Sequence, residues 1–186
     1  KETKLTLESA TGKKLEIECL NEYLSFKKPV DFIILNNDLS SGVPEGLSDS
    51  SIPIYPSIEA GWHKRKKSTH FNIANSLIKE FASQFKIDPW TLSCVHEQAT
   101  QIDINKESDR EQLFKHAQNV LTKIKTKYIE YNISEKPLVF IKANSGTYGM
   151  GVIAIENPHD ILTLNRKIRN KLAKGKSAIP ITNFII

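Results

Sequence analysis

Residues 137–155 read PLVFIKANSGTYGMGVIAI, and the rest of the chain is organised around this stretch. Four apolar residues, 138–141, follow Pro137 directly, which is typical of a short buried strand. A second apolar and β-branched run occupies 152–155. Between the two runs, three glycines fall within the six residues 146–151. The stretch therefore predicts two strands joined by a glycine-bearing loop.

The loop between these strands is suited to bind phosphate. Glycine allows positive φ and close backbone approach, so successive N–H groups can point at an anion. Lys142, at the exit of the first strand, adds a compact positive charge. The loop is neither a Walker loop nor a dinucleotide fingerprint, because no Gly-Lys-Ser/Thr ends it and a strand follows it. A plain β-hairpin with glycines in its loop is the alternative, and the lysine together with the three glycines favours a nucleotide.

The order strand, lysine, glycine loop, strand resembles the ATP-grasp enzymes, in which this hairpin closes over ATP. The resemblance implies that Lys142 contacts the nucleotide phosphates. It also implies that the loop covers these phosphates through Gly146, Thr147, Tyr148, Gly149, Met150 and Gly151.

Composition indicates an ordinary globular protein. The 186 residues are 39% hydrophobic and 25% charged, and they can bury one sizeable core or two small ones. No apolar run approaches the roughly 20 residues of a membrane span, and the first residues are too polar for a signal peptide. Cys19 and Cys94 are too few and too far apart for a disulfide framework. We expect both to be reduced, in a cytoplasmic protein.

The net charge of +5 is concentrated near the end of the sequence. Residues 161–186 hold six basic residues and no acidic one, whereas residues 1–160 hold 20 basic and 21 acidic residues. A second basic run, 64–67, lies between Trp62 and Phe71. Such a run can bind carboxylates, phosphates or nucleic acid, and most often it forms a solvated surface. The charge therefore marks local faces rather than a polycation.

The first part of the chain predicts a hairpin and then a strand that ends in polar side chains. Residues 3–20 alternate apolar and polar residues around a turn, as a β-hairpin does. Residues 30–35, VDFIIL, predict a buried and parallel strand. Ligands of open α/β sheets bind beyond the carboxyl ends of strands, so the polar groups that follow suit a small polar substrate: Asn37, Asp38 and Ser40. By residue type alone, an ordinary turn is the better interpretation of these three residues.

Apolar residues at helical spacing predict two helices in the middle of the chain. Residues 72–85 carry one apolar face, and Ser68 or Thr69 is expected to cap this helix. Its N-terminus, beside the basic run, favours an anion. The clearest helix is 108–131, which begins with a capping box, Ser108–Glu111. The apolar faces consist of Ile73, Leu77, Phe81 and Phe85 in the first helix and of Leu113, Ala117, Val120, Leu121, Ile124 and Tyr128 in the second.

The segment after the glycine loop predicts a helix and a strand. An asparagine–proline pair, 157–158, caps and opens a helix that runs to about residue 173, with Gly175 as its stop. Residues 178–186 predict the strand. In the helix, Arg166 and Arg169 are able to reach phosphates, and exposure to solvent is the preferred interpretation. The buried face consists of Ile161, Leu164, Ile168 and Leu172.

At five motifs the whole chain comes to resemble one small family. The motifs are ILNNDLSSGVP, GWHKRKKSTHF, IDPW, KANSGTYGMG and LNRKIRNK. In order and spacing, from about residue 6 to residue 186, they resemble the ATP-dependent glutamate–cysteine ligases of proteobacterial type, which perform the first step of glutathione synthesis. The usual loop of that family has Asp-Ala where this sequence has Asn144 and Ser145, so a negative charge beside the phosphates is lost. The family extends beyond both ends, which implies that the chain is an internal fragment.

The resemblance implies an α/β, ATP-grasp-like fold in three parts. Residues 1–104 are expected to form part of a substrate-side α/β domain, and residues 105–136 a connecting helix. Residues 137–186 are expected to form a truncated nucleotide lid of strand, glycine loop, strand, helix and strand.

The chemistry implied by the resemblance is ATP-dependent activation of a carboxylate. ATP phosphorylates the γ-carboxylate of glutamate, and the amine of cysteine then displaces phosphate from the acyl phosphate. The cofactors are ATP and Mg²⁺, and the metal ligands of the family lie late in the ATP-grasp domain, beyond this sequence. No metal ligand and no catalytic residue is therefore assigned. The candidates for binding the amino-acid substrates are Asn37, Asp38, Ser40, Arg65 and Lys66.

Two other functions fit parts of the sequence. A basic module could bind nucleic acid through residues 64–67 and 166–176, with an affinity that depends steeply on salt. That function leaves Lys142 and its loop unexplained, and no aromatic platform interleaves with the basic residues. The other function is a nucleotide-binding domain that keeps the fold but has no activity of its own, because it lacks the metal ligands. We expect the fragment alone to be inactive for this reason. We expect small-molecule partners, glutamate and cysteine, and neither a membrane nor nucleic acid.

Overall fold

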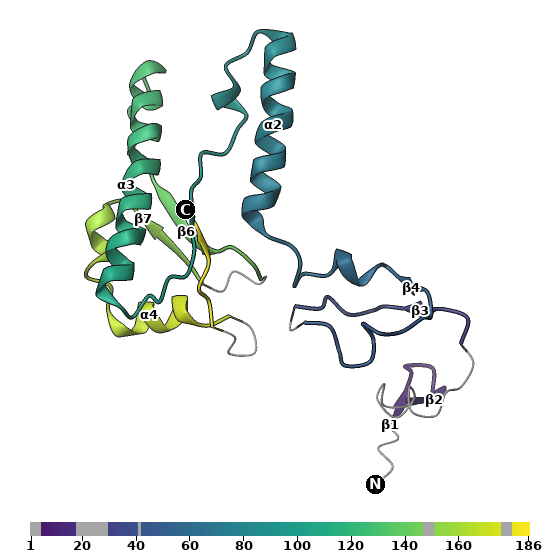
Figure 1. Cartoon of the computed structure of the whole chain (residues 1–186). Helices are drawn as coiled ribbons and strands as arrows, with labels where there is room; N and C mark the ends of the chain where they lie inside the picture. The colour runs from purple at the N-terminus through teal and green to yellow at the C-terminus, as the bar shows by residue number, and fades with distance from the viewer. Residues whose placement is uncertain (1–4, 18–29, 41, 147–150, 176–179) are drawn as a thin grey trace.

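The computed structural model of the protein describes residues 5–17, 30–40, 42–146, 151–175 and 180–186. Figure 1 shows a hairpin near the N-terminus, a short pair of strands that leads into a long helix, and a sheet with two helices against it. In chain order the elements are β1 (Leu5–Glu8), β2 (Lys14–Ile17), β3 (Ile33–Ile34), β4 (Ile54–Tyr55), η1 (Ile58–Ala60), α2 (Lys67–Phe85), η2 (Pro89–Thr91), β5 (Gln98–Ala99), α3 (Glu107–Glu130), β6 (Val139–Ala143), β7 (Val152–Ile155), η3 (Pro158–Ile161), α4 (Arg166–Ala173) and β8 (Phe184–Ile185).

A four-stranded antiparallel sheet forms the centre of the second half of the chain. Its strand order is β5-β8-β6-β7. β6 and β7 form a hairpin in which Val139 lies opposite Ile155 and Lys142 lies opposite Val152. The two predicted strands are therefore confirmed, and residues 147–150 of their loop lie outside the described residues.

The sheet also joins segments that the sequence assigned to different parts. β5 lies within residues 1–104, the expected substrate-side domain, and it pairs with β8, which lies within the expected lid, residues 137–186. The α/β class is confirmed by this arrangement of small sheets and helices. The division into three parts stays a prediction.

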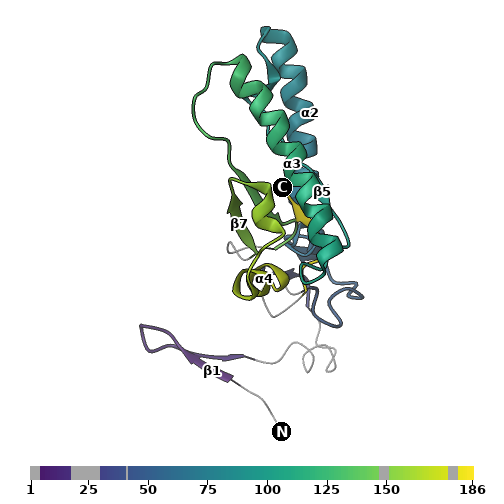
Figure 2. The same cartoon turned by 90° about the vertical axis from the view of Figure 1, so that its left-hand side faces the viewer.

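Helix α3 covers one face of this sheet. Side chains alternate along a strand, and Val139 and Ile141 of β6 both point to the covered face and are buried. They belong to the same apolar cluster as Leu113 and Ala117 of α3, both of which are fully buried. Figure 2 shows α3 beside the strands and α4 at one end of the sheet. The apolar face predicted from helical spacing is thus confirmed as the main core of the protein.

The predicted capping box at the start of α3 is wrong. The helix begins at Glu107, and the side chain of the preceding Lys106 makes no capping hydrogen bond. Ser108 instead donates a hydrogen bond to Asp109. The other carboxylate oxygen of Asp109 accepts the backbone N–H of Asp103. The polar side chains of the first turn are therefore engaged with the preceding loop rather than with the helix end.

Two helices replace the single helix predicted for residues 158–173. The 3-10 helix η3 is capped by Asn157, as predicted, and α4 begins only after a turn. Asn165 causes the break, because its side chain accepts the N–H of Ile168 and so starts a new helix. The apolar spacing runs through both helices and conceals the break. The predicted face is retained, with Ile161, Leu164 and Leu172 buried and Ile168 partly buried.

Helix α2 stands beside the sheet rather than on it (Figure 1). It begins at Lys67, earlier than predicted, and the residue at its N-cap is Lys66, whose side chain makes no capping bond. The predicted caps, Ser68 and Thr69, lie inside the helix. Its apolar face faces solvent, with exposed fractions between 48% and 61%, and consists of Ile73, Leu77, Phe81 and Phe85.

The strand predicted for residues 30–35 pairs in parallel as expected, but it is not buried. β3 pairs with β4, a strand that lies between two prolines and was missed for that reason. Phe32 is 56% exposed and Ile34 is 72% exposed. The described part of the chain places too little apolar structure over this pair to cover it.

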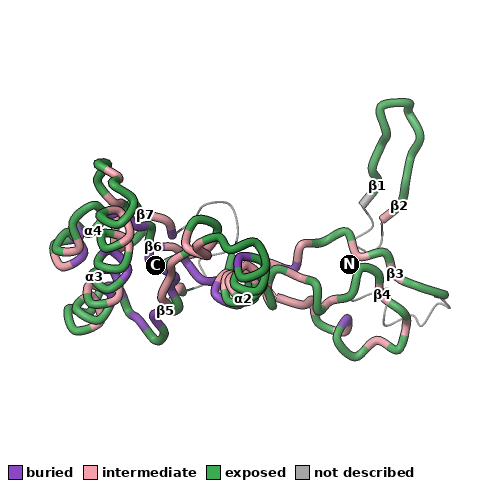
Figure 3. Tube along the Cα trace, turned by 90° about the horizontal axis from the view of Figure 1, so that it is seen from above, coloured by how far each residue is buried: buried purple, intermediate pink, exposed green. Residues whose placement is uncertain are grey.

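The N-terminal hairpin is confirmed, with Leu5 opposite Ile17 and Glu8 opposite Lys14. Residues 6–16 are exposed, and Figure 3 shows the hairpin projecting from the rest of the chain. Buried residues cluster instead around the sheet and α3 (Figure 3). Among the described helices, none combines the length and the apolar character that crossing a membrane requires.

Candidate functional site

Lys142 lies on the face of β6 that α3 does not cover. Val139 and Ile141 alternate with Phe140 and Lys142, so the second pair points away from the core. Phe140 is 46% exposed, and the ammonium group of Lys142 lies 5.0 Å from the centre of its ring. Backbone pairing on both sides, with Val152 and Ile185, holds Lys142 within the sheet. The predicted phosphate ligand is thus a partly exposed cation on a rigid strand.

The two described ends of the glycine loop require glycine. Gly146 has φ +87° and Gly151 has φ +64°, a region that other L-residues rarely adopt. A side chain at Gly146 would meet nothing within 4 Å, so open space adjoins the loop there. At Gly151, a Cβ atom would lie 2.8 Å from the side chain of Ile181. The ends are held together by a 3.1 Å hydrogen bond from the N–H of Ala143 to the carbonyl of Gly151.

Asn144, the first residue after β6, caps helix α2 from a distance in sequence. Its backbone carbonyl accepts the N–H of Lys67 at 2.8 Å, and its side-chain oxygen accepts the N–H of Ser68 at 2.9 Å. Its side-chain amide donates to the hydroxyl of Ser68 at 2.9 Å. Asn144 is 1% exposed. The first N–H groups of α2 are therefore occupied, and the anion site predicted at this helix end is not formed by them.

The ammonium group of Lys67 binds the backbone at the start of the glycine loop. It donates to the carbonyls of Ala143 at 2.8 Å, Gly146 at 3.1 Å and Ser145 at 3.5 Å. Burial lowers the pKa of Lys67 below its usual value, and the positive charge of Lys142 lowers it further. Both lysines therefore stand at the exit of β6, one bound by carbonyls and the other on the open face.

The predicted substrate residues of the first strand form turns. The side-chain oxygen of Asn37 accepts the N–H of Leu39, and that of Asp38 accepts the N–H of Ser40. The carbonyl of Asp38 also accepts the N–H of Trp62 at 2.9 Å. That bond brings residues 37–40 beside the basic run. These observations favour the turn interpretation for the two side-chain oxygens, and a role of residues 37–40 in binding substrate stays a prediction.

The remaining basic residues of the run are partly engaged with their neighbours. The guanidinium group of Arg65 donates to the carbonyl of Ala60 and lies 4.8 Å from the centre of the Trp62 ring. Lys64 forms an ion pair with Glu59 at 3.3 Å. Lys66 is exposed at the N-cap of α2. The basic run 64–67 therefore does not form a continuous surface of exposed, unengaged cations.

In helix α4, Arg169 is half-buried and donates to the carbonyl of Leu164. The expectation that it is exposed is wrong, because the helix break at Asn165 leaves that carbonyl within its reach. Arg166 is exposed, as expected.

The segment before β5, residues 94–97, contacts α2 and α3, and no function was predicted for it. Asn75 of α2 exchanges two hydrogen bonds with the backbone of Cys94, at 2.8 and 3.0 Å. His96 bonds to Asn72 of α2, whereas the neighbouring Glu97 bonds to His116 and Lys123 of α3, so the two adjacent side chains point in different directions. Partial burial raises the pKa of the Cys94 thiol, and the charge of nearby Lys142 opposes this shift.

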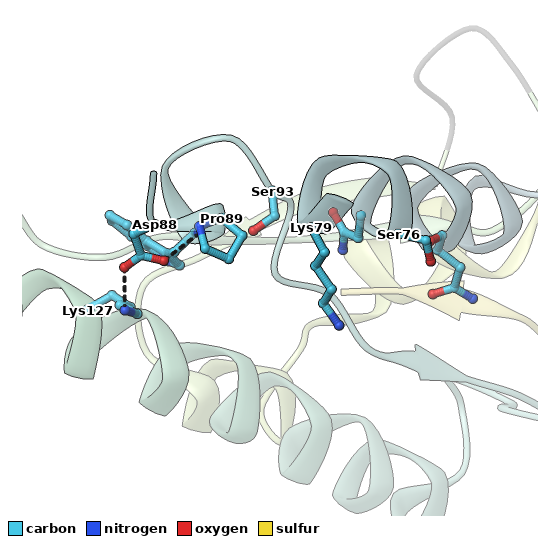
Figure 4. A pocket seen from close by; sticks show the side chains of 9 residues that line it. Ser76, Lys79, Asp88, Pro89, Ser93 and Lys127 are labelled. Atoms are coloured by element: carbon cyan, nitrogen blue, oxygen red, sulfur yellow. Dashed lines mark hydrogen bonds and ion pairs between the residues drawn. The ribbon is translucent and has the colours of Figure 1, made fainter. Parts of the chain in front are cut away.

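The IDPW motif lies at a separate pocket of about 570 Å³ where α2, η2 and α3 meet. In Figure 4, Asp88 and Lys127 lie together at one end of the pocket, and Lys79 reaches it from α2. The carboxylate of Asp88 accepts hydrogen bonds from Lys127 at 2.7 Å and from the N–H of Trp90 at 2.9 Å. None of the predicted site residues lines this pocket. The described contacts of the motif connect η2 to α3.

The described residues form no group of three or more His, Cys, Asp or Glu side chains that could hold a metal ion. No described residue is therefore assigned to a magnesium site.

A sequence model of the glutamate-cysteine ligase family, GshA, matches residues 1–186. A crystal structure from Methylobacillus flagellatus KT, assigned as a gamma-glutamylcysteine synthetase, has a TM-score of 0.74 to this protein and shares 32% sequence identity with it. The match covers 98% of this chain and 44% of that chain, so this chain spans less than half the length of that protein. No curated protein matches the chain.

The fold and the site define an α/β protein with a lysine and a glycine loop at the exit of a central strand. The family match over residues 1–186 and the structural likeness point to the same family. The chain belongs to the glutamate-cysteine ligase family.

Proposed function

We propose that this chain is part of an ATP-dependent ligase that joins the γ-carboxylate of glutamate to the amine of cysteine. Family membership supports the reaction class. The observation that carries the proposal is Lys142, a partly exposed cation on the open face of β6, directly before a loop whose described ends need glycine. A lysine beside a loop of backbone N–H groups is suited to the phosphates of ATP.

The proposed reaction has two steps. An oxygen of the γ-carboxylate attacks the terminal phosphorus of ATP, the bond to ADP breaks, and a γ-glutamyl phosphate forms. The amine of cysteine then attacks the acyl carbon and loses a proton. The bond between this carbon and the bridging oxygen breaks, and inorganic phosphate leaves with that oxygen. Such catalysis depends mainly on positioning and on charge neutralisation. Lys142 would neutralise phosphate charge, and magnesium would do so when bound, although no described residue is assigned to hold it.

The arrangement proposed for the whole site is ATP-grasp-like. The nucleotide would lie against Lys142 and the loop 146–151, in a lid formed by residues 137–186. The amino-acid substrates would lie on the side of Asn37, Asp38, Ser40, Arg65 and Lys66. Contacts that run from Asp38 to Trp62 and from Lys67 to the start of the loop support this placement, because they join the two sides. We propose a cytoplasmic enzyme, since two cysteines so far apart indicate a reducing compartment.

The alternative of a nucleic-acid module receives little support from the basic run. Lys64, Arg65 and Lys67 all contact groups of the protein itself. A ligase predicts that affinity for DNA or RNA is weak at physiological salt, where a nucleic-acid module would bind and would lose affinity steeply as salt rises.

The test is turnover of ATP by the complete gene product with magnesium, glutamate and cysteine. Phosphate release should require both amino acids, and mass spectrometry should detect γ-glutamylcysteine. Lys142→Ala should raise the KM for ATP by about 10-fold to 100-fold, since a hydrogen bond to a charged group contributes about 1.5–3 kcal/mol. Lys125→Ala is the charge-matched control, because Lys125 is an exposed lysine of α3 and is expected to leave this KM unchanged.

Each outcome separates one part of the proposal from the others. Turnover with a different pair of amino acids would keep the carboxylate-activating mechanism and reject the substrates. Equal ATP binding by the wild type and Lys142→Ala would reject the assigned phosphate ligand and with it the proposed site.

A further inference from the structure

Two motifs that lie 76 residues apart meet in a single buried cluster, formed by Lys67 and Ser68 at the start of α2 and by Asn144 after β6. We call these three residues the clip. Four polar groups are paired within it: the N–H of Lys67, the N–H and hydroxyl of Ser68, and the side-chain amide of Asn144. Ser68 is 4% exposed and Asn144 is 1% exposed. Movement of residue 144 away from α2 would leave buried polar groups unpaired, which costs about 1–3 kcal/mol for each group.

The clip also restrains the backbone on either side of Asn144. The N–H of Asn144 donates to the carbonyl of Asn183 at 2.9 Å, which ties it to the segment leading into β8. The ammonium group of Lys67 binds the carbonyls of residues 143, 145 and 146, so one cation holds the turn that begins the glycine loop. Lys142 precedes this turn by one residue. The direction in which the loop leaves the sheet is therefore set by α2, an element outside the hairpin.

The clip caps α2 with a residue that is distant in the sequence, although a residue directly before the helix could have capped it. Lys66 precedes α2 without a capping side chain, so Asn144 supplies the cap that the helix lacks. An ordinary N-cap residue would achieve this from within the helix sequence. Capping from the glycine loop instead makes the position of the loop and the start of α2 depend on each other.

We propose that Lys67, Ser68 and Asn144 are positioning residues that hold the start of the glycine loop in the geometry that binds ATP. This inference rests on the proposed role of Lys142 and the loop in ATP binding. Their action is indirect, through the orientation of residues 142–146. The clip should therefore influence the binding of ATP much more than the binding of either amino acid.

The experiment measures the Kd for ATP with magnesium, and the KM for each substrate, in the complete gene product. Asn144→Ala should weaken ATP binding by about tenfold, which corresponds to about 1.4 kcal/mol. The KM values for the amino acids should change by less than about twofold on the same scale. Asn144→Asp keeps the oxygen that accepts the N–H of Ser68, and its second oxygen can accept a hydrogen bond from the Ser68 hydroxyl, which then donates instead of accepting. Asp also caps helices as well as Asn does, so this variant should restore binding to about threefold of wild type.

A double-mutant cycle tests the contact directly. Ser68→Ala removes the hydroxyl that accepts a hydrogen bond from the side-chain amide of Asn144. This variant should weaken ATP binding by about threefold. The double variant should bind ATP no more than about twofold more weakly than Asn144→Ala alone, because the contact is already lost. Additive effects would contradict the clip. Ser68→Ala carries the test if Asn144→Ala proves too unstable to assay.

Asn165→Ala is the matched control, since Asn165 also caps a helix with its side chain, and among the described residues its side chain bonds to Ile168 of its own helix rather than to the clip. It should leave ATP binding unchanged. If Lys142→Ala weakens ATP binding while Asn144→Ala behaves like Asn165→Ala, the clip is overturned and the proposed function survives. Hydrogen exchange gives a readout independent of ATP: the amides of residues 143–146 should exchange at least about tenfold faster in Asn144→Ala and Lys67→Met than in Asn165→Ala. Equal exchange in all variants would overturn the clip whatever the fate of the proposed function.

Discussion

Asp88 connects η2 to the end of α3 through one carboxylate. One oxygen accepts the N–H of Trp90 and caps η2, and the other accepts hydrogen bonds from Lys127 and from the hydroxyl of Tyr131. The rings of Trp90 and Tyr131 stack with their centres 5.1 Å apart. The hydrogen bond from Lys127, followed by those from Trp90 and Tyr131, lowers the pKa of Asp88 to about 2. The connection between α2 and α3 therefore contains an acid-sensitive contact.

This lowered pKa predicts how stability depends on pH. The folded state holds the carboxylate charged more strongly than the unfolded state, whose pKa is near 3.8. The contribution of Asp88 is thus complete above about pH 4 and is lost as the pH falls toward about 2. Asp88→Asn should be less stable than wild type at pH 7, and the difference should shrink on acidification through this window.

Denaturant unfolding of both proteins between pH 2 and pH 7 measures this difference. Asp160→Asn, at an exposed carboxylate of η3, is the comparison variant that removes one acidic group elsewhere in the chain. A constant difference between wild type and Asp88→Asn across the range would contradict the assignment.

At the scale of elements, asparagine side chains determine where helices begin. Asn157 starts η3, Asn165 starts α4, and Asn144 starts α2 from another part of the chain. In each case a side-chain oxygen accepts an N–H group that the helix itself leaves unpaired. Two of these caps are local in sequence, and one is not.

The cap of α4 leads to a prediction about that element. Asn165→Ala should lower the free energy of unfolding by about 1 kcal/mol, because the N–H of Ile168 loses its acceptor. Asn165→Asp should retain most of the stability, since Asp caps helices equally well. Urea denaturation of the three proteins checks this prediction, and an alanine variant as stable as wild type would show that water replaces the cap without cost.

At the scale of the whole molecule, stability comes from the core between α3 and the sheet. Leu113, Ile141 and Phe184 are all fully buried there, although they come from three distant segments. The N-terminal hairpin and the β3–β4 pair contribute no residue to this cluster. Unfolding should therefore be governed by the segment from β5 to β8.

A pair of substitutions on α3 tests this expectation. Leu113→Ala should lower the free energy of unfolding by about 2–5 kcal/mol, because it leaves a cavity in a close-packed core. Ile129→Ala, on the same helix but 79% exposed, should change it by less than about 0.5 kcal/mol. Similar losses for both variants would place the core elsewhere.

Local patterns in the sequence were enough to predict much of the fold. The apolar runs at 138–141 and 152–155 predicted β6 and β7, and the helical spacing of α3 predicted its buried face. These signals succeed because side-chain direction follows directly from strand and helix geometry. The positions of Lys142, Gly146 and Gly151 beside these strands were also predicted in this way, and their role in binding phosphate stays a prediction. The whole-chain resemblance likewise predicted the family to which the chain belongs.

Only the tertiary structure determined that the start of α2 lies beside the residues that follow β6. The clip joins Lys67 and Ser68 to Asn144 through hydrogen bonds, and neither motif carries a local sign of its partner. The same holds for Asn75 with Cys94 and for Asp88 with Lys127. The cap predicted at Ser68 failed for a related reason, because Asn144 pairs with both its N–H and its hydroxyl. A polar side chain forms hydrogen bonds with the groups that the fold places near it. Its partners therefore depend on how the chain packs and not on its neighbours in the sequence.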